Sequence, residues 1–166
     1  GDFNLFRTGR RRQISHLMRR QGDLLDVDVR IFDYQYSKGF GKNRRTRRQT
    51  VFFMESKKLA LPQFFMKPES FFNRIGEWLG MQDIDFEEYP RFSRQYLLQG
   101  EDEELIRHAL SDKLLHFFTV EKDWTLEGLN YYLIFYRFDH LLPPEQVRLF
   151  YHKGLEICKL LNKQSF

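Results

Sequence analysis

Apolar and charged residues alternate between positions 25 and 31, in the string LDVDVRI. Successive side chains of a strand point to opposite faces of a sheet, so this alternation predicts a strand with one buried face. Residues 49–54, QTVFFM, are a second run rich in strand-forming residues. The segment between them, SKGFGKNRRTRR at residues 37–48, holds two glycines that permit tight turns. The pattern predicts a long hairpin over residues 24–54 with a basic tip.

The middle of this hairpin carries apolar residues on both faces. Phe32, Tyr34 and Tyr36 alternate on the face opposite the first apolar set, which places Asp33 and Gln35 on the apolar side. Either the sheet is covered on both faces, or a bulge shifts the register. A buried Asp33 would need a partner, and an arginine or a backbone N–H is the one that we expect.

The segment before the hairpin is interpreted as a short basic helix. Ile14, Leu17 and Met18 share one face at helical spacing, arginines surround them, and Gly22 is a plausible end. A basic amphipathic helix suits a membrane surface or a nucleic acid. Three apolar residues make a weak membrane anchor, so a docking helix with solvated arginines is favoured.

Further strands and helices are predicted from the same patterns and from Gly and Pro residues, which mark turns and element ends. The predicted strands are 59–66, with Pro62 at an edge or bulge, 96–99, and a second hairpin of 124–126 and 131–138 turned at Glu127–Gly128. The predicted helices are 68–79, 101–110, a turn of helix from Ser111, and a last helix from Pro143 to about Asn162. This order indicates an α+β fold: an antiparallel sheet of about five to seven strands, packed by helices that include a long C-terminal one.

Length and composition agree with one globular domain over residues 1–166. The chain has 18 Phe, so we expect an aromatic-rich core. Cys158 is its only cysteine, which excludes an internal disulfide and fits a reducing compartment. No run approaches the length of a membrane-spanning helix.

The net charge of +4 is unevenly distributed. Residues 1–48 hold 13 Lys or Arg against 5 Asp or Glu, whereas the remainder holds 14 against 18. Such asymmetry points to an electropositive face with phosphate-bearing or acidic partners. The candidate contact residues are basic and lie before or within the predicted hairpin tip: Arg10, Arg11, Arg12, Lys42, Arg44, Arg45, Arg47 and Arg48. A solvated tip whose arginines pair with the acidic second half is an equally weighted alternative.

Candidate chemistry elsewhere is sparse. The string GFGK lacks the first glycine and the Ser or Thr of a phosphate loop, and no histidine pair has zinc-ligand spacing. Asp83 and Asp85, with neighbouring glutamates, could hold a hard cation or act as an acid–base pair, but pairing with the basic tip is favoured. A buried, inert Cys158 is favoured over a nucleophile. We assign no catalytic residue, metal or cofactor.

Five strings carry a resemblance that covers the chain from Phe3 to about Leu161: FDYQY, GKN with QTV after it, MKPESFFNRIGEWLG, QDIDFEEYPRFSRQYLLQGEDE and VEKDWTLEGLNYYLIFYR. The chain resembles an uncharacterised bacterial family, well represented in cyanobacteria, that has no established activity. The resemblance implies a membrane anchor before this region, which agrees with a chain that begins at Gly1. The arginines after Phe6 would then lie near the bilayer on the cytoplasmic side.

These observations lead to three functional hypotheses. The first is a non-catalytic, membrane-proximal binding module that contacts anionic lipid or an acidic protein. The second is backbone-type nucleic-acid binding, with Tyr34, Tyr36 and Phe40 stacking on bases. The third is an unrecognised enzyme that uses Asp33, His108 or the Asp83/Asp85 pair.

Overall fold

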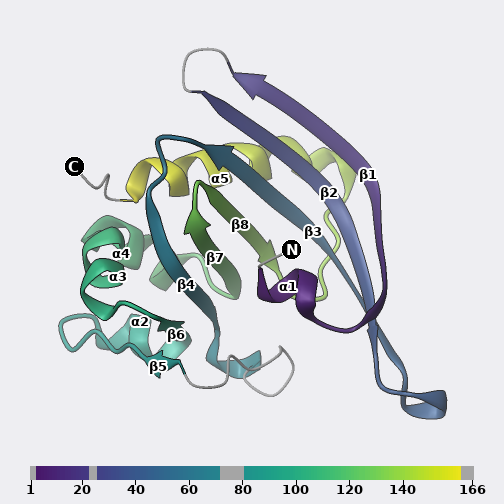
Figure 1. Ribbon diagram of the computed structural model, residues 1–166, viewed down its shortest axis with the longest axis horizontal. Helices are drawn as coiled ribbons and strands as arrows, with labels where there is room; N and C mark the ends of the chain where they lie inside the picture. Colours follow the sequence, from purple (N-terminus) through teal and green to yellow (C-terminus); the bar gives the residue numbers. More distant parts are fainter. Residues whose placement is uncertain (1–2, 23–25, 72–80, 162–166) are drawn as a thin grey trace.

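The structure is a computed structural model that describes residues 3–22, 26–71 and 81–161. One antiparallel sheet of eight strands organises these residues, in the order β1-β2-β3-β8-β7-β4-β6-β5 (Figure 1). Seven of the strands have five or more residues, and the eighth, β5, has two. The predicted α+β fold with an antiparallel sheet and a long C-terminal helix is therefore confirmed.

The elements have these bounds. The strands are β1 Arg10–Gly22, β2 Val27–Lys38, β3 Arg45–Ser56, β4 Leu61–Pro68, β5 Gln82–Asp83, β6 Tyr96–Gly100, β7 Trp124–Asn130 and β8 Tyr132–Arg137. The helices are α1 Asn4–Arg7, α2 Pro90–Gln95, α3 Glu103–Ala109, α4 Asp112–Val120 and α5 Val147–Leu160, with short 3₁₀ turns η1 Gly41–Asn43, η2 Glu69–Phe71 and η3 Pro144–Gln146. The predicted helix over residues 68–79 falls largely on residues outside those described.

The predicted hairpin is the longest continuous ladder of the sheet. β2 and β3 pair without interruption from Val27–Ser56 to Lys38–Arg45. The turn depends on Gly39, whose φ is +80° and whose added Cβ would lie 2.6 Å from the backbone oxygen of Asn43. L-residues with a side chain disfavour this left-handed region, so glycine is the residue that closes the turn.

Both faces of the sheet are covered, which decides between the two alternatives for the middle of the hairpin. Val29 and Ile31 belong to a cluster with residues of α3, α4 and α5. Phe32, Tyr34 and Tyr36 belong to a separate cluster that includes Phe3 and Leu5, in and beside α1. Figure 1 shows α1 and α5 on the two sides of this part of the sheet. No register shift interrupts the β2–β3 pairing here.

The larger core is rich in aromatic rings, as the composition predicts. Trp124 and Phe135 stack with ring centroids 4.1 Å apart, and Phe135 stacks on Phe150 of α5 at 5.6 Å. α5 approaches the sheet closely because Gly154 faces Phe52, where an added Cβ would lie 2.4 Å from the ring. These contacts fix α5 on the sheet, since offset and edge-to-face ring pairs add to simple area burial.

The predicted basic helix before the hairpin is wrong, because these residues form β1, an edge strand paired with β2. The register shifts twice, between Arg10 and Gln13 and between Ser15 and Met18. Arg11 and His16 have φ values of +52° and +51° within these shifts. Side chains of a regular strand return to the same face every two residues, and each bulge inserts one extra residue into this repeat. The apolar residues are therefore spaced three or four positions apart, as on one face of a helix.

The predicted turn at Glu127–Gly128 is also wrong, because both residues lie inside β7. The hairpin instead turns after Asn130, which has a φ of +52°. Close packing requires a glycine at position 128, since an added Cβ would lie 2.4 Å from the ring of Phe64. Pro62 fits its prediction, because the pairing of β4 with β7 shifts between Leu61 and Phe64.

Candidate functional site

The hairpin tip, residues 39–44, extends beyond the rest of the sheet (Figure 1). A short 3₁₀ turn shapes it: the Asn43 N–H donates to the Phe40 oxygen at 3.0 Å, and the Arg44 N–H donates to the Gly41 oxygen at 3.3 Å. Phe40 lies between the two glycines and is 73% exposed. An aromatic side chain is thus displayed on a backbone that its own hydrogen bonds hold in place.

Basic residues flank Phe40 along the turn and on the strands that lead into it. Lys38, Lys42, Arg44 and Arg45 are exposed, and none of them forms an ion pair within the described part of the chain. Arg10 joins them from β1, because its guanidinium lies 4.8 Å from the centroid of the Phe40 ring. We call this set the basic tip surface: Arg10, Lys38, Phe40, Lys42, Arg44 and Arg45.

The remaining predicted contact residues have other roles or positions. Arg12 donates to the backbone oxygens of Arg7 and Gly9, at 2.8 and 3.1 Å, and so holds the chain that enters β1. Arg11 is exposed within the first bulge of β1. Arg12 is therefore already occupied by backbone acceptors, although its edge position leaves it exposed.

Two of the predicted arginines bind polar groups of the sheet. Arg47 forms an ion pair with Asp139 at 2.7 Å, and Arg48 donates to the side-chain oxygen of Gln35 at 2.7 Å. The Arg48 backbone N–H also donates to Asp139 at 3.1 Å. Asp139 therefore neutralises Arg47, whereas the Arg48 guanidinium binds an uncharged amide.

The expected pairing of the acidic segment with the basic tip is wrong. Asp83 lies on β5, at the sheet edge opposite β1. It accepts from the Gln99 side chain at 2.7 Å, and the Asp85 backbone oxygen accepts from Arg107 at 2.6 Å. Among the described residues, no group of three or more His, Cys, Asp or Glu is placed to hold a metal ion.

Asp33 is part of a polar cluster on the face of Ile31. Its side chain is 25% exposed, and its two oxygens contact the Thr50 hydroxyl at 2.8 Å and the His16 Nδ1 at 2.9 Å. Thr50 in turn accepts from the Leu142 N–H at 2.9 Å. The partners of the Asp33 carboxylate are therefore a hydroxyl and an imidazole. Within the described part of the chain, neither an arginine nor a backbone N–H takes the role predicted for it.

The residues suggested for an unrecognised enzyme are not brought together. His108 lies on α3, which packs against β4, whereas Asp33 lies on β2. The strands β3, β8 and β7 separate β2 from β4 in the sheet. Asp33, His108 and the Asp83/Asp85 pair therefore do not form one catalytic arrangement.

Sequence reasoning missed the buried carboxylate of Glu127. This side chain is fully buried, and its two oxygens accept from the backbone N–H groups of Asn4 at 2.6 Å and Leu5 at 3.2 Å. Burial raises the pKa of Glu127 to about 8, and these two donors offset part of that rise. Local sequence patterns carry no sign of this contact, because the partners lie 122 and 123 positions away.

Two of the three aromatic residues suggested for base stacking are inaccessible. Tyr34 and Tyr36 are buried beneath the α1 segment, and burial raises the pKa of Tyr36 to about 12. Phe40 remains exposed. The surface thus offers one ring rather than the series of rings that single-strand binding proteins use.

Within the described residues, no helix combines the length and the apolar character needed to cross a bilayer. Comparisons with protein-family models, with curated proteins and with solved structures found no match to this chain. The candidate site therefore depends on the geometry of the basic tip surface.

Proposed function

We propose that this protein is a non-catalytic binding module that contacts an anionic membrane surface through its basic tip surface. The observation that carries the proposal is the exposed Phe40 ring at a protruding turn. Arg10 lies against this ring, and Lys38, Lys42, Arg44 and Arg45 flank it along the turn without carboxylate partners in the described chain. An aromatic ring in the interface and basic groups at the headgroups are the two elements that peripheral membrane-binding segments combine.

The expected affinity is low. Each Lys or Arg near an anionic bilayer contributes about 1 kcal/mol, so the five cations of the basic tip surface contribute about 5 kcal/mol when all are engaged. A free energy of about 5 kcal/mol corresponds to a dissociation constant of roughly 0.2 mM. Such a contact is reversible and sensitive to salt, and it suits a domain that a second membrane signal already holds nearby, as the family resemblance implies.

The geometry favours a membrane over a nucleic acid. Backbone-type nucleic-acid binding would use the same cations, but its aromatic contribution from Tyr34 and Tyr36 is lost through burial. A flat anionic surface needs only one protruding point of contact, which the hairpin provides.

Vesicle co-sedimentation tests the proposal. We expect the protein to sediment with vesicles that contain phosphatidylserine and to remain in solution with neutral phosphatidylcholine vesicles at low salt. Arg44→Ala with Arg45→Ala should reduce the bound fraction several-fold, and Phe40→Ala should reduce it at constant charge. Lys113→Ala with Arg148→Ala is the matched control, because these exposed residues of α4 and α5 carry the same charge elsewhere.

Equal sedimentation with both vesicle types would contradict the proposal. A loss of binding that is identical in the tip and control double variants would also contradict it, since the effect would then depend on net charge alone. A mobility shift of single-stranded nucleic acid at the same salt, without vesicle binding, would favour the alternative function.

A further inference from the structure

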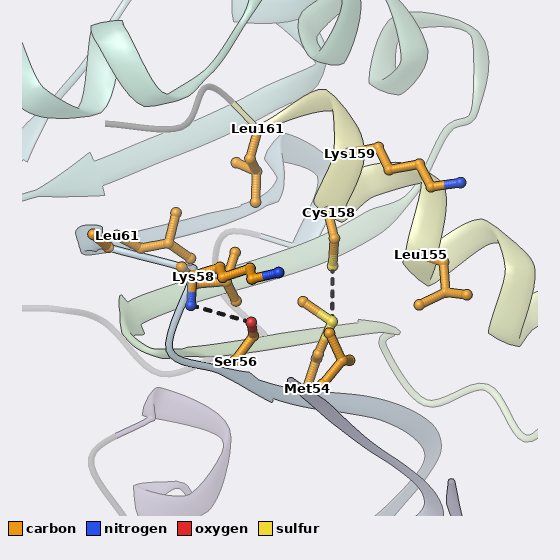
Figure 2. Close-up of a pocket in the computed structure, with 11 residues that line it drawn as sticks. Met54, Ser56, Lys58, Leu61, Leu155, Cys158, Lys159 and Leu161 are labelled. Atoms are coloured by element: carbon orange, nitrogen blue, oxygen red, sulfur yellow. Dashed lines mark hydrogen bonds between the residues drawn. The ribbon is translucent and has the colours of Figure 1, made fainter. Parts of the chain in front are cut away.

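An apolar pocket of about 220 Å³ lies at the end of the hairpin opposite its tip (Figure 2). The C-terminal half of α5 forms one wall, and the end of β3 with the segment that leads into β4 forms the other. Its apolar lining is made by Val27, Met54, Leu59, Leu61, Leu155 and Leu161. The pocket is larger than the roughly 150 Å³ that suffices for benzene in an engineered protein cavity.

The sulfur atoms in the wall behave as apolar groups. Cys158 Sγ lies 3.3 Å from Met54 Sδ, and Figure 2 shows the two sulfur atoms facing each other in direct contact. Burial raises the pKa of the Cys158 thiol, so this group stays protonated. It therefore adds polarizable surface and no charge.

The charged residues at the pocket are all basic. Lys58 and Lys159 are the charged members of its lining, which includes no Asp or Glu. Figure 2 shows the Lys58 side chain reaching across the pocket toward Cys158, whereas Lys159 points away. Lys58 is exposed and forms no ion pair within the described residues.

A hydroxyl lies beside the Lys58 backbone on the same pocket wall. The Ser56 Oγ accepts from the Lys58 backbone N–H at 3.2 Å, which leaves the Ser56 O–H as a donor on the pocket wall. An ammonium group and a hydroxyl over an apolar cavity together match a carboxylate attached to a hydrocarbon chain.

We propose that this pocket binds a free single-chain anionic amphiphile, a fatty-acid-like molecule. Its hydrocarbon chain enters between α5 and β3, and its carboxylate pairs with Lys58 and accepts from Ser56. The positive charge of Lys58 and Lys159 disfavours a cationic amphiphile, and a neutral amphiphile finds a partner only in the Ser56 hydroxyl. The modest volume suits a single chain, since sites for drug-sized ligands begin at about 300 Å³.

The pocket and the basic tip surface lie at opposite ends of the hairpin. Eleven residue steps separate Val27 from Lys38, which at about 3.3 Å per residue places the pocket about 36 Å from the start of the turn. The two surfaces share no residue. The pocket proposal therefore does not rest on the membrane proposal, and either can fail alone.

Displacement of a fluorescent fatty acid tests the pocket. Purified full chain is saturated with cis-parinaric acid, and laurate or 1-dodecanol is then added. We expect saturable displacement by laurate and weaker displacement by the uncharged alcohol. Lys58→Gln should weaken laurate about three- to fivefold, the size of a solvent-exposed ion pair, and leave 1-dodecanol unchanged. Lys57→Gln is the matched control, an exposed neighbour outside the lining.

A pocket-filling substitution provides the second arm. Leu155→Trp places a larger side chain in the pocket wall and should abolish saturable displacement. Leu149→Trp should not, because Leu149 is 65% exposed and lies outside the pocket lining. Failure of laurate to displace the probe would overturn the proposal. Equal laurate constants for Lys58→Gln and Lys57→Gln, or equal displacement from the two tryptophan variants, would overturn it as well.

Discussion

At Val27 and Ser56 the β2–β3 hairpin packs under α5, whereas at Lys38 and Arg45 the same two strands are exposed to solvent. The backbone ladder is continuous between these ends, so backbone pairing does not distinguish them. Side-chain burial distinguishes them: the end at Val27 and Ser56, the base of the hairpin, packs against the core, whereas the tip carries exposed charge. An isolated two-stranded ribbon is marginally stable in water. The packed base therefore holds the tip in a position where its own side chains are free to serve a partner.

The largest expected effect is at the base. Gly154→Val should lower the free energy of unfolding by about 3 kcal/mol, because the new side chain overlaps the Phe52 ring and forces α5 away from the sheet. Urea denaturation measures the loss. Gly22→Val at the end of β1 is the control, since nothing lies within 4 Å of an added Cβ there. Equal stability of the two variants would show that α5 is not seated on Phe52.

The stability of α1, which covers the middle of the hairpin, should respond to pH through Glu127 on β7. Its pKa in the folded protein is about 8, above its ordinary value of 4.5, so the folded state binds an extra proton between these values. The stabilisation is complete below the unfolded value and is lost as pH rises through about 8. Between pH 6 and pH 8 we expect the free energy of unfolding to fall by about 2 kcal/mol.

Glu127→Gln separates this effect from other titrations. The amide cannot ionise and still offers an oxygen to the N–H groups of α1, so the difference in pH slope between the two proteins isolates the carboxyl group. Denaturation at pH 6, 7 and 8 gives both slopes. Parallel slopes would show that the buried carboxylate does not control the docking of α1.

Substitutions in the turn should lower the free energy of unfolding less than Gly154→Val does. Gly39→Ala should cost about 1–2 kcal/mol, because its φ of +80° is strained for alanine and the Cβ meets the Asn43 oxygen. Gly41→Ala should cost less, since its φ is +53° and the surrounding space is open. Thermal unfolding compares them. The reverse order would mean that the turn does not have the conformation described.

The smallest effect on stability is expected from the tip side chains. Phe40→Ala, and Arg44→Ala with Arg45→Ala, should change the free energy of unfolding by less than about 0.5 kcal/mol. These side chains are exposed, and exposed side chains outside the core contribute little to stability. Unfolding curves of the variants used for vesicle binding provide the measurement. A large loss would show that the tip is structural and would remove the contrast between the two ends.

The hairpin and the basic tip surface could be predicted because local signals define them. Alternation gives the strands, and Gly39 and the run of arginines give the turn and its charge. The roles of individual arginines could not be predicted in this way. Arg47 is neutralised by Asp139, a residue 92 positions away that the sheet order brings alongside.

The errors in predicted structure have related causes. The sequence of β1 resembles a helix because bulges at Arg11 and His16 break the period of a strand, and pairing with β2 stabilises these bulges. Gly128 resembles a turn residue in the sequence, but its packing against Phe64 on another strand explains why glycine stands there. In both cases a tertiary neighbour decides which local conformation is adopted.

The fold class, the hairpin, the aromatic core and the positive charge near residues 10 and 44 follow from the amino-acid sequence alone, since periodicity, turn residues and composition act locally. Tertiary contacts decide which cations of the described residues remain unpaired, which face hides Tyr34 and Tyr36, and how Glu127 and Lys58 are placed. These depend on which strands become neighbours, and burial and charge pairing act through space between residues far apart in the chain.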